Sequence, residues 1–119
     1  WRQLPAVIAG LDINLMPLEN SLFHWCKSEN KWTEAALVKV PSVMSRNCEM
    51  EYVVENGKDG WMCTTKEEWV NALEALVTDE KARKAMGEAA HQKVMEHYLT
   101  VNTGKDAMEE LLCSESYTK

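Results

Sequence analysis

The sequence lacks an excess of basic residues, a long apolar run and a signal peptide, and each absence excludes a class of protein. Lys and Arg number 13 against 19 Asp and Glu. The formal charge of −6 argues against a nucleic-acid binder and against adsorption to an anionic membrane, since both need a basic face. The longest uncharged apolar stretch, Leu4–Leu11, is far shorter than the roughly 20 residues of a membrane span. No basic start with an apolar run and a cleavage site is visible.

Closely spaced cysteines are also missing. The four cysteines stand at positions 26, 48, 63 and 113, without a CxxC pair and with no histidine at zinc-finger spacing. This predicts a reduced, cytoplasmic protein with no metal and no cofactor. The alternative is a small secreted protein with a disulfide framework.

What is present suffices for one domain. The 119 residues are 45% hydrophobic, enough for a buried core and too short for two domains. Because the first residue is Trp1 rather than methionine, we interpret residues 1–119 as a single fragment of a longer protein.

Short apolar segments alternate with helical patterns along the chain. The predicted strands are residues 12–16, 42–45 and 61–63. A loop is expected over 17–24. The predicted helices are residues 25–38 and 49–55, two longer ones that begin near Thr65 and Thr78-Asp79, and a last one over 105–113. This order predicts an α/β fold with a partial Rossmann-like parallel sheet and flanking helices.

The two longer helices carry clear signals. Thr65 with Glu68 matches a capping box. The residues expected on the buried stripes are Trp69, Leu73, Leu76 and Val77 in the first helix and Met86, Ala90, Val94 and Tyr98 in the second.

In such folds ligands bind at the carboxyl ends of the strands, here the loops after Met16, Ser45 and Cys63. Backbone N–H groups at the start of the helix after the first strand form a natural anion site. Lys27 and Lys31 add two cations there. Ser28 adds a hydroxyl, and the Glu34 carboxylate is suited to accept hydrogen bonds from a sugar diol. The alternative is an ordinary solvated helix face with i, i+4 pairing.

Other polar residues are weaker candidates. His24 stands at the loop end, where a general acid or a sugar contact is conceivable, although a lone histidine is more often a packed or surface residue. Glu49 and Glu51 are interpreted as ordinary partners of a helix dipole rather than as a catalytic pair.

A family resemblance rests on an ordered series of motifs. It begins with Leu15-Met-Pro-Leu-Glu-Asn and continues through Lys27-Ser-Glu-Asn-Lys-Trp-Thr-Glu-Ala-Ala and Glu51-Tyr-Val-Val-Glu-Asn-Gly-Lys-Asp-Gly60. The series covers roughly residues 5 to 99. It resembles the later part of the donor-binding domain of family 4-like (group 1) glycosyltransferases of the GT-B fold.

The resemblance implies roles for individual residues. The family has two Glu residues separated by seven others. The second, which binds the nucleotide ribose, matches Glu34, and Cys26 takes the place of the first, which contacts the donor sugar. Lys27 and Lys31 then face the diphosphate. The backbone amides placed near it are those of Ser28, Glu29 and Asn30.

The implied full-length protein is a glycosyltransferase of the hexosyltransferase type. It would bind a nucleotide diphosphate sugar for transfer to a saccharide or lipid-linked acceptor in polysaccharide biosynthesis, in the cytoplasm and peripheral to the membrane. The N-terminal acceptor domain is absent, so the fragment alone is expected to be inactive. The alternative is a non-catalytic α/β binding or scaffold module. We also expect the fragment to self-associate through the run 5–11 and the strand at 12–16.

Overall fold

The computed structural model describes residues 2–114. Its elements in chain order are α1 (Leu4–Ala9), β1 (Asn14–Met16), α2 (Leu22–Trp25), α3 (Asn30–Leu37), β2 (Ser42–Ser45), α4 (Cys48–Val53), β3 (Trp61–Cys63), α5 (Lys66–Thr78), α6 (Glu80–His97) and α7 (Thr100–Ser114). Within the described residues the sheet has three parallel strands in the order β1-β2-β3. The predicted α/β class and the three strands are therefore confirmed.

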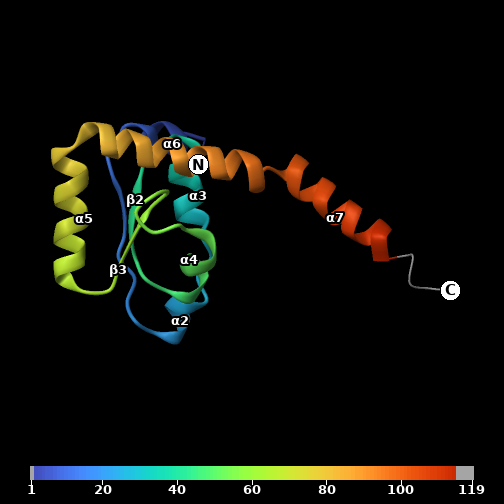
Figure 1. Cartoon of the computed structure of the whole chain (residues 1–119), viewed down its shortest axis with the longest axis horizontal. Coiled ribbons are helices and arrows are strands. Elements are labelled where there is room, and N and C mark those ends of the chain that lie inside the picture. The colour runs from blue at the N-terminus through green and yellow to red at the C-terminus, as the bar shows by residue number, and fades with distance from the viewer. Residues whose placement is uncertain (1, 115–119) are drawn as a thin grey trace.

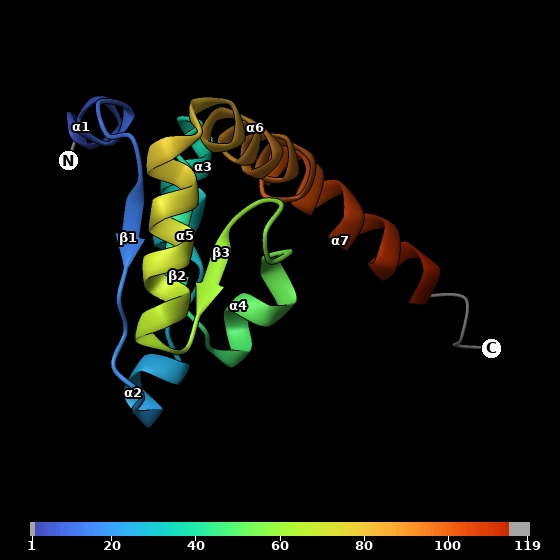
Figure 2. The ribbon, with the colours of Figure 1, turned by 60° about the vertical axis from the view of Figure 1, so that its left-hand side comes forward.

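Both faces of the sheet are covered, because successive side chains of a strand point to opposite faces. Met16, Met44 and Met62 belong to one apolar cluster, which also contains Trp32 from α3. Val43 and Cys63 belong to a second cluster, with residues of α5. Figure 2 shows α3 and α5 on opposite sides of the strands, with α6 crossing at their amino ends. This leaves the carboxyl ends for α2, α4 and the connecting loops.

Helix α3 packs against α6 at very short range. Its C-terminus is a Schellman-type turn in which the N–H of Val40 donates to the Ala35 carbonyl at 3.0 Å and that of Lys39 to the Ala36 carbonyl at 3.1 Å. Lys39 adopts a φ of 62° in this turn. A Cβ built on Gly87 of α6 would lie only 2.1 Å from the Lys39 carbonyl oxygen, so the glycine permits the close approach.

Helix α5 begins as predicted. The Thr65 side chain accepts the Glu68 N–H, and the Glu68 carboxylate accepts the backbone N–H groups of Thr64 and Thr65. Leu76 is buried, whereas Trp69 and Leu73 are half-buried against the second cluster. Prediction of a buried Val77 was wrong, since its side chain is 65% exposed. The buried stripe runs through residues 69, 72, 73 and 76. Val77 follows Leu76 directly, so its side chain points about 100° away from that stripe around the helix axis.

Helix α6 places the predicted Met86, Ala90 and Val94 in the core. Tyr98, just beyond its end, is half-buried and meets Trp32 edge-on at 5.9 Å between ring centroids. Helix α7 starts earlier than predicted and projects away from the rest of the molecule (Figure 1). The helices described between residues 2 and 114 include none that is both long and apolar enough to cross a membrane.

The prediction around residue 25 was partly wrong. The expected loop over 17–24 contains most of the short helix α2, and the expected helix 25–38 begins only at Asn30. Trp25 ends α2, is 47% exposed and donates its indole N–H to the Asn20 side chain at 2.8 Å. The single helix expected over 25–38 is therefore replaced by the end of α2 and by α3, with residues 26–29 between them.

Candidate functional site

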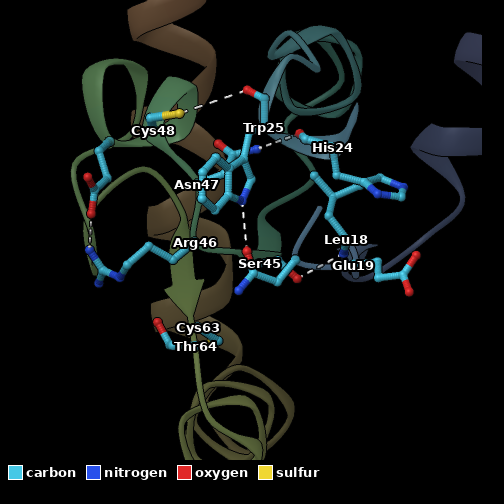
Figure 3. A pocket seen from close by; sticks show the side chains of 12 residues that line it. Leu18, Glu19, His24, Trp25, Ser45, Arg46, Asn47, Cys48, Cys63 and Thr64 are labelled. Atoms are coloured by element: carbon cyan, nitrogen blue, oxygen red, sulfur yellow. Dashed lines mark hydrogen bonds and ion pairs between the residues drawn. The ribbon is translucent and has the colours of Figure 1, made fainter. Parts of the chain in front are cut away.

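A pocket of about 390 Å³ lies at the carboxyl ends of the three strands. As expected from the sequence, its walls come from the segments that follow β1, β2 and β3. The polar and aromatic side chains among the lining residues are Glu19, Asn20, His24, Trp25, Ser45, Arg46, Asn47, Glu51 and Thr64. Figure 3 shows that the labelled residues among them come from separate elements. Pockets of this size and position are the usual small-molecule sites of such sheets.

Hydrogen bonds between the segments hold the pocket in shape. The Leu18 N–H donates to the Ser45 hydroxyl at 2.8 Å, which ties the loop after β1 to the end of β2. Asn47 accepts the Met50 N–H at 2.9 Å and so caps α4. Its amide nitrogen also donates to the His24 carbonyl at 3.4 Å. The walls are thereby fixed relative to one another without a ligand.

The charges at the pocket are arranged around one arginine. Arg46 donates to the Glu51 carboxylate at 2.9 Å, and both side chains remain partly exposed. Burial, with the nearby Glu68 carboxylate, raises the pKa of the Cys63 thiol at the pocket wall, although Arg46 opposes the shift. Cys63 is therefore a neutral thiol at physiological pH. An exposed indole and a guanidinium are groups that proteins use to bind rings with polar or anionic substituents.

His24 is held as a structural residue. Its Nδ1 lies 2.8 Å from the Ser21 hydroxyl, which precedes α2. The ring is also edge-on to Phe23, at 5.2 Å between centroids. Glu49 and Glu51 occupy the first turn of α4, the position expected for dipole partners. Among the residues that the structure describes, no group of three His, Cys, Asp or Glu side chains could hold a metal ion.

None of the six residues predicted to bind the donor is in the lining of this pocket. Lys27 precedes α3 and places its ammonium 5.1 Å from the centroid of the Phe23 ring. Ser28 is exposed, Glu29 is the N-cap of α3 and Asn30 is its first residue. The amino end of α3 therefore stands at the same edge of the sheet as the pocket, because a helix between parallel strands runs antiparallel to them.

Lys31 and Glu34 lie further along α3. The Lys31 side chain is exposed, while its carbonyl accepts the Asn14 amide at 3.4 Å. Glu34 is half-buried and lines a separate groove of about 300 Å³ between α1 and α3, together with Pro5 and Ile8. The structure thus separates Glu34 from the pocket at the strand ends.

Sequence reasoning missed most of the lining residues, including Asn20, Trp25 and Arg46. Trp25 was placed at the start of the expected helix 25–38, and Asn20 and Arg46 were not considered. A signal was available, because Asn20 follows the first strand within four residues and Arg46 directly follows the second. Polar residues at the ends of parallel strands deserved the same weight as the helix start.

Comparison with known proteins identifies the chain. A model of the "Glycosyl transferase-like" family matches residues 2–110. The chain belongs to this glycosyl transferase-like family. A search among curated proteins found no match.

A solved structure shows the same fold as this glycosyl transferase-like chain. It is the C-terminal domain of a glycosyl transferase group 1 family protein, LpcC, from Francisella tularensis, with a TM-score of 0.61 and 17% sequence identity. The match covers 82% of this chain and 49% of that structure, so the chain spans about half of its length. The predicted relation to the C-terminal part of a GT-B glycosyltransferase is confirmed at the level of family and fold.

Proposed function

We propose that the chain is the donor-binding part of a glycosyltransferase that transfers a hexose from a nucleoside diphosphate sugar to a saccharide or lipid-linked acceptor. The family match over residues 2–110 carries the proposal. It is supported by the position of the amino end of α3, at the same edge of the sheet as the pocket.

The segment before and within α3 supplies the groups for the nucleotide. The exposed Lys27 and Lys31 neutralise the diphosphate, whose negative charge grows as the sugar leaves. Backbone N–H groups at Ser28, Glu29 and Asn30 add donors at the positive end of the helix. Glu34 accepts hydrogen bonds from the ribose diol.

The acceptor and its base belong to an acceptor domain outside this chain. Within a whole protein the donor and acceptor meet in the cleft between the two parts. By this proposal, the chain alone binds the donor and does not turn it over.

Calorimetry on the natural full-length protein with nucleoside diphosphates tests the donor site. Glu34→Gln should weaken binding by roughly one to two decades, since hydrogen bonds to a charged group contribute about 1.5–3 kcal/mol. Lys31→Ala should weaken it in a salt-dependent manner. The matched controls are Glu74→Gln on α5 and Lys81→Ala on α6, two exposed side chains on other helices.

The site assignment fails if both α3 variants bind like the wild type while circular dichroism shows an intact fold. A non-catalytic binding module is the second candidate, because exposed Cys26 stands where the family carries a glutamate. Binding of a nucleoside diphosphate sugar by the natural full-length protein, without transfer of the sugar to any acceptor, would support that candidate.

A further inference from the structure

Two exposed cysteines lie on neighbouring elements at the rim of the pocket. Cys26 is the C-cap of α2, and Cys48 is the first residue of α4. Both are free thiols, and both are exposed. Neither is among the residues assigned above to the nucleotide, so the result of the test below does not decide that assignment.

Two contacts align the chain around these cysteines. The Asn47 amide reaches the His24 carbonyl at 3.4 Å, and Cys48 Sγ lies 3.9 Å from the Trp25 carbonyl oxygen (Figure 3). The first contact joins residue 47 to residue 24, and the second joins residue 48 to residue 25. The next residue after Trp25 is Cys26, so its thiol extends from the segment that Cys48 already touches.

The spacing suits a covalent link. The Cα of Cys26 is one peptide unit beyond the Trp25 carbonyl oxygen, so Cys48 Sγ lies within about 7 Å of that Cα. In a disulfide the two Cα atoms are about 4.4–6.8 Å apart. Because the limit of about 7 Å runs from Cys48 Sγ and not from its Cα, bond formation requires the end of α2 and the start of α4 to approach each other. Because both side chains are exposed, rotation about their χ1 bonds can turn the two sulfurs toward each other.

We propose that Cys26 and Cys48 form a reversible disulfide across the rim of the pocket, by exchange with a low-molecular-weight disulfide such as oxidised glutathione. The thiolate of one cysteine attacks the oxidised reagent and releases one thiolate from it. The second cysteine then attacks the mixed disulfide, forms the protein S–S bond and releases the other. The two cysteines lose two protons and two electrons, and the reagent becomes two thiols.

The bond would change the pocket. It would connect α2 to α4, and the residue next to it, Trp25, lines the pocket. Oxidation would therefore add a covalent link to the hydrogen bond from Asn47 to the His24 carbonyl, which already joins the indole wall to the segment that carries Arg46. Cys63 takes no part, because it is only 2% exposed.

The test uses the full chain with Cys113→Ser. Cys26 and Cys48 are then the exposed cysteines that the experiment follows. After incubation with oxidised glutathione, the intact mass should fall by two hydrogens and peptide mapping should link positions 26 and 48. The thermal midpoint should rise by about 5–10 °C, and dithiothreitol should reverse both changes. The Cys26→Ser and Cys48→Ser variants should each form one glutathione adduct and no internal disulfide. Their thermal midpoints should not rise.

Three results would overturn the proposal. They are stable glutathione adducts on both cysteines, a link that involves Cys63, and disulfides found only between two molecules. Circular dichroism of both serine variants checks that the fold is unchanged, so that a missing link reports on geometry rather than on unfolding.

Discussion

Gly87→Ala should destabilise the protein although alanine is the better helix former. Gly87 lies within α6, where alanine would stabilise the helix by about 1 kcal/mol if space were free. The added Cβ would lie 2.1 Å from the Lys39 carbonyl oxygen and 2.8 Å from its carbonyl carbon. Non-bonded heavy atoms prefer about 3.5–4.0 Å, so α6 would have to retreat from α3 by more than about 1 Å.

The carbonyl cannot move aside cheaply. Lys39 is part of the turn that ends α3, held by its own hydrogen bond to Ala36 and that of Val40 to Ala35. Overpacking costs typically about 1–3 kcal/mol, and here both colliding groups are backbone. We expect a net loss of about 2–3 kcal/mol in the free energy of unfolding, and a thermal midpoint lower by about 8–12 °C.

Gly104→Ala is the matched control. Gly104 also lies within a helix, α7, but a Cβ there would meet nothing within 4 Å. That variant should be neutral or more stable by up to about 1 kcal/mol. Urea unfolding followed by circular dichroism measures both. If Gly87→Ala were as stable as Gly104→Ala, the close approach of α6 to the α3 turn would be refuted.

Further variants test the core, a buried ion pair and a helix cap. Leu76→Ala, at a buried position, should lose about 2–5 kcal/mol in urea unfolding, and the half-buried Leu73→Ala should lose less; equal losses would contradict the burial pattern. Asp59→Asn removes the charge that Lys93 contacts at 2.7 Å and should lose about 1.5–3 kcal/mol; an unchanged midpoint would show that the pair contributes nothing. Backbone N–H groups lower the pKa of Glu68, so its stabilisation is present above its unfolded-state pKa and is lost as the pH falls through the lowered value. Glu68→Gln should therefore weaken the acid dependence of the thermal midpoint, and an identical pH profile would argue against the cap. The outer edge of β1 has no partner within the described residues, so light scattering at high concentration should show self-association, and a strict monomer would oppose it.

The candidate site was predictable in location but not in composition. The rule that ligands bind at the carboxyl ends of parallel strands placed it after Met16, Ser45 and Cys63, and the pocket lies there. The prediction of its residues concentrated on one charged helix start. Trp25 was missed because a tryptophan at helical spacing is usually a core residue, and only the folded loop shows its indole bound to Asn20.

Local patterns by themselves determined most of the elements. Alternation that stops at Pro17, the capping box at Thr65 and Glu68, and apolar repeats such as Met86 and Val94 specify strands and helices through contacts within a few residues. The ordered motifs also indicated the family, because they depend on sequence alone.

Only the tertiary structure decided how these elements meet. The place of Glu34 in a groove against α1 and the contact between Gly87 and Lys39 both depend on residues distant in sequence. Their cause is the angle and distance at which whole helices pack, which no local pattern encodes. The approach of Cys48 to the segment before Cys26 arises in the same way, since it follows from the folding of α2 and α4 onto one end of the sheet.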